Sequence, residues 1–376
     1  MITYEMLSRP QRALFVLLNT GLWNRVPEKE FFRGFSESEW REVYRISIEQ
    51  GVMAIVFDAV MRLPDECKPP RSLKLNWALN VEAQEVRYAS QEAVARELSD
   101  VLWKDNIPML HFKGLSLAQF YPIPSHREFG DLDIYLYGKY KEGNQKLIRQ
   151  GAVKNNDDPK HTSLTYKGIS VENHLSLIMF FRYPHLKSLN NNLIELCKES
   201  VGNIVSDSII YPDPDFNAIF VMSHALLHFP SSIVLRHLCD WVVFLEANKD
   251  KVDFAKYKMI LSEAGLLRAA EAFTALAVRF LGLDQGSAPT FMHDSALEDK
   301  ILLDILNPFV LQKKNPSPWE IVRFKYRTLK SNRWKYELVN PNRYDIFILH
   351  SIYYYLRHPE WFLRLKEKIN ESSGNC

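Results

Sequence analysis

Apolar residues recur at helical spacing through the first hundred residues of the chain. This pattern predicts helices over residues 11–23, 39–50, 53–62 and 72–104, the last of them long and rich in charged residues. Ser36 or Ser38 is expected to cap the second helix, because serine followed by acidic residues favours a helix start. Residues 1–105 are therefore predicted to be an N-terminal helical segment.

The hydrophobic period changes after residue 105. Residues 109–112 are a short apolar run, and residues 131–137 and 169–177 alternate between apolar and polar side chains, which predicts strands. Shorter strands are expected at 152–154, 164–166 and 204–210, and helices at 115–121, 139–151 and 192–199. Residues 106–211 are therefore predicted to form a core around a small mixed sheet.

Helical spacing returns after residue 211. Helices are predicted at 216–229, 231–248, 254–264, 267–281, 297–306, 319–331 and 344–358, with Asp215 as the cap of the first. Residues 212–376 are assigned to a C-terminal helical domain. The expected fold class is α+β, with a small mixed β-sheet core flanked by N-terminal and C-terminal helical segments.

Two carboxylates lie on one face of the strand at 131–137. Side chains alternate along a strand, so Asp131 and Asp133 point away from the apolar face. Neighbouring like charges are costly unless a cation neutralises them, and Mg²⁺ (or Mn²⁺) prefers such oxygen ligands. Glu172 and His174 share the polar face of the strand at 169–177, so Glu172 completes a cluster of three acids if the two strands are neighbours.

A tight turn at Lys113-Gly114 separates the first apolar run from a helix. Glycine lets the backbone approach a ligand, and free N–H groups at a helix start favour an anion such as phosphate. The residues expected to contact a nucleotide are Lys113, Gly114, Leu115, Ser116 and Arg127. Lys113 and Arg127 are equally well explained as solvated loop cations, and Ser116 as a capping residue.

These residues carry a resemblance to a known family. A strand, a glycine turn, a helix and an Asp-Leu-Asp strand resemble the DNA polymerase beta-like nucleotidyltransferase superfamily. The sequence from Phe112 to Tyr121, Arg127, Gly-Asp-Leu-Asp-Ile at 130–134 and Val-Glu-Asn-His at 171–174 more narrowly resemble the bacterial uncharacterised nucleotidyltransferase family. Residues 235–241 also resemble the family's helical part, so the similarity covers roughly residues 75–250. The chain departs from the superfamily where Gly-Gly or Gly-Ser is usual, because it has Gly114-Leu115.

The resemblance implies an enzyme, specifically a nucleotidyltransferase that moves a nucleoside monophosphate from an NTP to an acceptor hydroxyl. It implies that Asp131, Asp133 and Glu172 are catalytic and hold the metal, and that genes for polysaccharide biosynthesis often lie nearby. His174, Arg236 and Asp240 are candidates for the acceptor side. A structural histidine and an Arg236–Asp240 pair on a helix surface explain them as well. The acceptor and the nucleotide base stay open.

Composition says more about the cellular compartment of the protein than about the reaction it catalyses. A formal net charge of +2 over 376 residues favours no particular partner. Four scattered cysteines give no zinc or disulfide pattern, which favours a reducing cytosol. Neither a signal peptide nor an apolar run long enough to span a membrane is recognised, so a cytoplasmic protein is expected, and the resemblance implies a bacterial one. The sequence does not indicate an oligomeric state.

One segment supports a second hypothesis. Residues 321–368 combine many Lys and Arg residues with interleaved aromatic residues, a pattern that can bind nucleic acid or an anionic membrane surface. A solvated basic face over an aromatic core is favoured over this non-catalytic binding role. His224 and His228 are spaced for one helix face, and packing against the sheet is favoured over metal binding.

Overall fold

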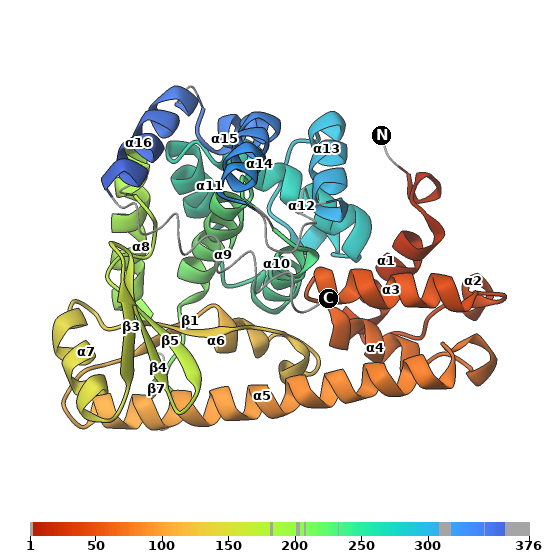
Figure 1. The fold of residues 1–376 in the computed structure, drawn as a ribbon, viewed down its shortest axis with the longest axis horizontal. Coiled ribbons are helices and arrows are strands. Elements are labelled where there is room, and N and C mark those ends of the chain that lie inside the picture. Colours follow the sequence, from red (N-terminus) through yellow and green to blue (C-terminus); the bar gives the residue numbers. More distant parts are fainter. Residues whose placement is uncertain are drawn as a thin grey trace.

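The structure, a computed structural model, describes residues 3–180, 183–200, 204–206, 208–231, 233–307, 317–341 and 343–357. A long helix, α5 (Arg71–Trp103), runs along one side of the molecule, with a mixed sheet against one end and the other N-terminal helices towards the other end (Figure 1). The C-terminal helices lie on the opposite side of the sheet from α5. The predicted α+β class, with helices on both sides of a central sheet, is confirmed.

The N-terminal helices follow the predicted pattern closely. They are α1 (Arg9–Leu22), α2 (Lys29–Phe32), α3 (Glu37–Glu49), α4 (Met53–Met61) and α5. Ser36 caps α3, because its Oγ accepts a hydrogen bond from the Glu39 backbone N–H at 3.3 Å and its own N–H donates to the Glu39 carboxylate at 2.8 Å. This reciprocal pair confirms Ser36 as the helix start.

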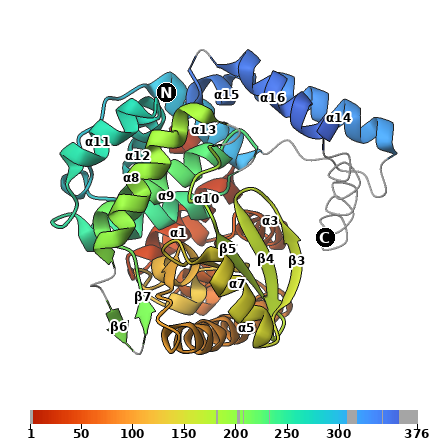
Figure 2. The same ribbon diagram turned by 90° about the vertical axis from the view of Figure 1, so that its left-hand side faces the viewer.

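The sheet has a mixed topology that was only partly visible in the sequence. Its strands are β1 (Leu110–Phe112), β2 (Asp131–Tyr135), β3 (Val153–Asp157), β4 (His161–Tyr166), β5 (Ile169–His174), β6 (Ile204–Ser206) and β7 (Ile209–Ile210). Their spatial order is β3-β4-β5-β2-β1-β7-β6. The β2–β5 and β1–β7 pairs are parallel, and the other pairs are antiparallel. Figure 2 shows β3, β4 and β5 side by side at one edge of the molecule.

The two faces of β2 have different neighbours. Leu132 and Ile134 lie in an apolar cluster with residues of α5, such as Leu98, and of α7 (Tyr140–Arg149), such as Leu147. The opposite face carries Asp131 and Asp133 and looks towards the C-terminal helices. The alternation read from the sequence therefore holds, and the acidic face is directed away from the long helix.

Helices return after the sheet, with local corrections to the predicted limits. The remaining helices are α6 (Gly114–Ala118), α8 (Lys187–Glu199), α9 (Pro214–His228), α10 (Leu235–Asn248), α11 (Phe254–Glu263), α12 (Leu267–Leu281), α13 (Ser295–Leu306), α14 (Pro318–Ser331), α15 (Arg333–Val339) and α16 (Tyr344–Arg357). Asp213, not Asp215, caps α9, since its carboxylate accepts from the Asp215 N–H at 2.9 Å and Pro214 occupies the first turn. Helix α10 starts at Leu235 rather than at Ser231.

The larger apolar core draws on all three predicted segments. It contains Leu14 of α1, Trp77 of α5, Phe112 of β1, Phe220 of α9 and Phe273 of α12, all nearly or fully buried. The boundaries at residues 105 and 211 stay a prediction, and the packing across them is continuous.

Two further expectations from the sequence concern membrane-spanning helices and cysteines. In the part of the chain that the structure describes, no helix is both long and apolar enough to cross a membrane. Cys67, Cys197 and Cys239 are buried free thiols.

Candidate active site

Parallel pairing of β2 and β5 brings the three predicted acids together. Asp133 lies directly opposite Glu172 in the register, and Asp131 lies two residues before Asp133 on the same face. One carboxylate oxygen from each of the three residues lies within 4.8 Å of the others. The expectation that the strand at Glu172 lies beside the Asp-Leu-Asp strand is confirmed, and a shared cation is within reach of all three.

The three carboxyl groups differ in their electrostatic surroundings. Burial and then the neighbouring carboxylates of Asp133 and Glu172 raise the pKa of Asp131 to about 6. Burial acts in the same direction on Asp133, but Lys113 and His174 outweigh it and hold the pKa of Asp133 well below its usual range. Burial also acts to raise the pKa of Glu172, but His174, His161 and Lys113 together outweigh it and lower that pKa to about 2. Asp131 is thus the acid whose ionisation most needs a cation.

His174 lies between two of the acids. Its side chain is fully buried, and its Nε2 lies 2.8 Å from Asp133 Oδ1 and 3.5 Å from Glu172 Oε2. The ring also packs edge-on against Phe112, with the ring centres 4.9 Å apart. These contacts hold Asp133 in place, which is the structural role that the sequence left open for His174 beside the acceptor side.

The turn at Lys113 has the geometry of a close approach. Lys113 has a φ of 60°, and its ammonium forms an ion pair with Asp133. A Cβ on Gly114 would lie 2.8 Å from the Phe129 ring, so glycine is needed for packing here. Lys113 and Gly114 line a cavity beside the acids, and their contact with a nucleotide stays a prediction.

Leu115 and Ser116 occupy different positions from Lys113. The Leu115 side chain is part of the apolar cluster under β2, and Ser116 is fully buried with no hydrogen-bond partner for Oγ among the described residues. Neither residue lines the cavity at the acids. Helix α6 has only five residues, so any contact of this turn with a ligand rests on Lys113 and Gly114.

Arg127 is held by a carboxylate of the C-terminal helices. Its Nε and Nη2 donate to the two oxygens of Asp240 at 2.9 and 2.8 Å, and Tyr121 also donates to Asp240 at 2.7 Å. Burial opposes ionisation of Asp240, but Arg127 outweighs it and lowers the pKa of that carboxyl. The guanidinium fork expected to meet phosphate is therefore occupied by a buried ion pair.

Arg236 does not form the helix-surface pair with Asp240 that its spacing suggested. Its Nη1 donates instead to the Glu128 carbonyl oxygen at 2.7 Å, and its Nε has no partner within the described ranges. Arg236 and Asp240 both line the cavity with the acids. The structure thus places them at the site, with Asp240 anchoring Arg127 and Arg236 still able to donate.

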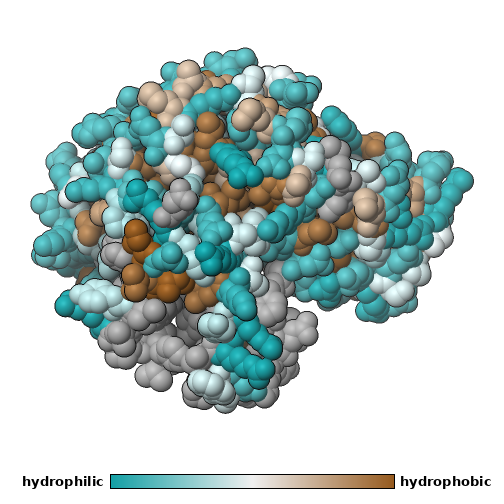
Figure 3. Space-filling view, turned by 90° about the horizontal axis from the view of Figure 1, so that it is seen from above, coloured by the Kyte–Doolittle hydropathy of each residue, from teal (hydrophilic) through white to brown (hydrophobic). Residues whose placement is uncertain are grey.

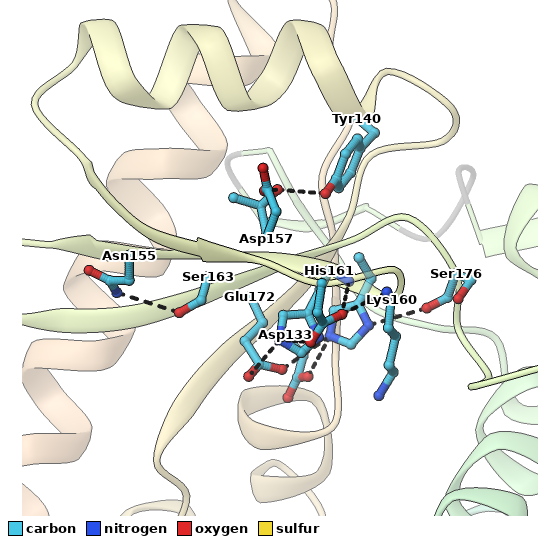
Figure 4. Close-up of polar contacts among 12 residues, drawn as sticks. Asp133, Tyr140, Asn155, Asp157, Lys160, His161, Ser163, Glu172 and Ser176 are labelled. Atoms are coloured by element: carbon cyan, nitrogen blue, oxygen red, sulfur yellow. Dashed lines mark hydrogen bonds and ion pairs between the residues drawn. The ribbon is translucent and has the colours of Figure 1, made fainter. Parts of the chain in front are cut away.

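Two residues of the site escaped the sequence analysis. His161 Nε2 lies 3.3 Å from Glu172 Oε1 and 3.3 Å from Asp158 Oδ2, and Lys160 is buried beside it (Figure 4). His161, Glu172 and His174 form a second group that could hold a metal ion. The missing signal was the length of the hairpin, because β4 starts at His161, opposite His174, and not at Leu164. Residues 160–163 are all polar, so the apolar alternation that marks the rest of the strand gave no signal there.

The acids open into a cavity of about 400 Å³. Helices α9 and α10 form its far wall with His224, His228, Arg236 and His237. Burial lowers the pKa of His237 to about 4, so its ring is neutral near pH 7, whereas the His228 side chain is exposed at the cavity. Helix α9 also packs on the sheet through Phe220, whose ring centre lies 5.2 Å from that of Phe112. Packing of α9 against the sheet, as expected, places His224 and His228 at the cavity.

The basic aromatic segment is described as far as Arg357. Tyr336 stacks on Phe347 with centroids 4.5 Å apart, and Lys335 pairs with Asp304 at 2.8 Å, so part of the segment packs into the molecule. Trp319 and Leu349 are exposed. From above, where these helices lie, the surface is mostly hydrophilic with apolar areas between (Figure 3). Residues 358–368 of the segment lie outside the described residues.

The site combines a mixed sheet, three carboxylates on adjacent strands, a glycine turn and a cavity with charged lining residues, an arrangement that fits a nucleotidyltransferase. The sequence model of the family described as "Uncharacterised nucleotidyltransferase" matches residues 36–282, which is more than half of the chain. The chain therefore belongs to that family, as the resemblance indicated. Searches of curated proteins and of solved structures gave no match.

Proposed function

We propose that the protein transfers a nucleoside monophosphate from an NTP to the hydroxyl of an acceptor, in a reaction that depends on Mg²⁺ (or Mn²⁺). The observation that carries this proposal is the convergence of Asp131, Asp133 and Glu172 within 4.8 Å on adjacent strands. Three buried acids repel one another, and a divalent cation is the natural partner for such a set.

Asp131 and Asp133 hold the metal, and Glu172 is the third acid. Bound there, a divalent cation neutralises the phosphate charge and lowers the barrier for displacement at phosphorus. The acceptor oxygen forms a bond to the α-phosphorus, the bond from that phosphorus to the bridging oxygen breaks, and pyrophosphate leaves. Glu172, with His161 only 3.3 Å away, receives the proton of the hydroxyl.

Lys113 and Arg236 supply positive charge for the phosphates. The Lys113 ammonium pairs with Asp133 in the structure and can turn to a phosphate oxygen when a cation takes its place. Arg236 lines the same cavity with an unpartnered Nε. Arg127 supports the site through its pair with Asp240. Most of the catalysis consists of positioning and charge neutralisation.

The chemical identity of the acceptor stays open. The resemblance to families whose genes accompany polysaccharide biosynthesis favours a saccharide or a saccharide precursor. No substrate is implied by the family's description, which names the transferase class alone.

Calorimetric titration of each NTP with Mg²⁺ into the protein tests the proposal. We expect binding by the wild type and a loss of at least about tenfold in affinity in Asp131→Asn/Asp133→Asn, because two anionic ligands are removed. Glu263→Gln, an exposed residue outside the cavity, is the matched control. Equal affinity in the wild type and the double variant would reject the metal assignment. A screen for pyrophosphate release with candidate acceptors then identifies the second substrate.

A further inference from the structure

A second cavity continues from the one at the acids. Its volume is about 200 Å³, and it shares Lys160, Met179, His224 and His228 with the first. Beyond these shared residues its lining is mainly apolar and aromatic: Leu177, Ile178, Tyr183, Leu227, Tyr336 and Phe347. The two cavities thus meet at a basic junction, with carboxylates on one side and an apolar chamber on the other.

Lys160 at the junction is a buried cation without an anionic partner of its own. Its exposed fraction is 7%, and across the described ranges no residue bonds to its terminal nitrogen. In Figure 4 the side chain extends beside Glu172 and Asp133, and no dashed line reaches its end. Those carboxylates are the proposed metal ligands. Once a cation neutralises them, Asp158 is the remaining carboxylate near Lys160, and it does not bond to the ammonium, so the buried charge is left without a direct partner, which is costly.

His224 and His228 complete the junction. Their ring centres lie 4.4 Å apart on one face of α9, and their ring nitrogens have no hydrogen-bond partner in the described part of the chain. Burial lowers the pKa of the His224 ring, which is therefore a neutral imidazole with one N–H to donate. The His228 side chain is exposed at the same cavities. Among the described residues, none accepts a hydrogen bond from the Lys160 ammonium or from either ring.

We propose that this junction binds an anionic group of the acceptor, a phosphate or a carboxylate, and that the second cavity holds an apolar or planar part of the same molecule. The inference rests on the proposed function and names the class of its second substrate. Lys113, Gly114 and Arg236 line the first cavity and not the second, so the triphosphate has its own contacts. The acceptor hydroxyl would then reach Glu172 from the junction.

Phenyl phosphate is a probe that combines the two features, and inorganic phosphate carries only the anion. Both are titrated calorimetrically into the full-length protein in the presence of Mg²⁺, so that the carboxylates near Lys160 are neutralised. We expect phenyl phosphate to bind the wild type more tightly than inorganic phosphate does. Lys160→Met should lower the affinity for phenyl phosphate by roughly tenfold, because one charge-assisted hydrogen bond is lost.

The apolar part of the site is tested by Leu227→Trp, which fills the second cavity. This variant should lower the affinity for phenyl phosphate and leave the affinity for inorganic phosphate unchanged. Lys251→Met, an exposed lysine that lines neither cavity, is the charge-matched control.

The affinity for Mg²⁺ and NTP separates this inference from the proposed function. It should be unchanged in Lys160→Met, and a parallel loss would assign Lys160 to the triphosphate and overturn the acceptor site. Equal phenyl phosphate affinity in the wild type and Lys160→Met would also overturn it. Failure of the proposed function would appear instead as Mg²⁺–NTP binding that ignores Asp131→Asn/Asp133→Asn. Because Lys160 has no ionic partner, Lys160→Met should keep the melting temperature of the wild type, which excludes unfolding as the cause of lost binding.

Discussion

Asp131 is the residue at which function opposes stability. Its neighbours Asp133 and Glu172 are held ionised by Lys113 and His174, so the repulsion falls on Asp131 and raises its pKa. A carboxyl with a raised pKa binds its proton more tightly in the folded state. Its contribution to stability is present below the unfolded pKa of about 4 and is lost as the pH rises through about 6.

Asp131→Asn should therefore stabilise the protein in the absence of metal at pH 8, by about 2 °C in melting temperature. The gain should shrink at pH 5, where Asp131 of the wild type is largely protonated. Differential scanning fluorimetry in EDTA at the two pH values measures this. Asp133→Asn is the comparison, and it should lower the melting temperature at pH 8 because it leaves Lys113 and His174 without their partner. A destabilised Asp131→Asn at pH 8 would contradict the charge assignment.

Sequence patterns located the acids and missed their neighbours. Asp131, Asp133 and Glu172 could be placed because alternation along a strand is local information. Lys160 and His161 could not, because the hairpin that carries them begins in a polar stretch with no apolar alternation before Leu164. The partner of Arg127 was also out of reach, since Asp240 is 113 positions away and only tertiary packing brings the two together.

At the level of helices and strands, two long-range links assemble the site. Parallel pairing of β2 with β5 supplies the acids, and the Arg127–Asp240 ion pair joins the loop before β2 to α10. The alternation predicted the faces of these strands, but pairing order cannot be read from alternation alone. The helices were predictable because their spacing is local, apart from the short α2 and from α15, where aromatic and basic residues hide the pattern.

The link through α10 can be tested by removing one partner. Asp240→Ala should lower the free energy of unfolding by about 3–5 kcal/mol, because the buried Arg127 guanidinium loses its counter-charge. Urea unfolding followed by circular dichroism measures the change. Replacing both partners, in Arg127→Met/Asp240→Leu, should recover much of the loss. A double variant as unstable as Asp240→Ala would show that the pair does more than neutralise one buried charge.

For the molecule as a whole, the continuous core determines whether the three predicted segments unfold together. The family match itself, residues 36–282, crosses both predicted boundaries. Composition and periodicity divide the chain by the kind of element, whereas packing joins α1, α5, β1, α9 and α12 around shared apolar residues. A division by element type is thus visible in the sequence, and the joint core is not.

We expect thermal unfolding to be a single transition. Circular dichroism, which follows the helices of all segments, and tryptophan fluorescence, which follows eight residues including the buried Trp40, Trp77 and Trp241, should give the same midpoint. Mg²⁺ with NTP should raise both midpoints equally. Separate transitions would instead support independent units with limits near residues 105 and 211.

The ion pair between Lys113 and Asp133 has a thermodynamic consequence for ligand binding. The Lys113 ammonium occupies the position that an incoming cation must take. Mg²⁺ alone therefore competes with Lys113 for Asp133, and its binding free energy is small. A nucleotide that binds together with the cation supplies a phosphate oxygen, and the displaced Lys113 ammonium can donate to it. We therefore expect the metal and the nucleotide to bind synergistically, each at low affinity alone and at higher affinity together.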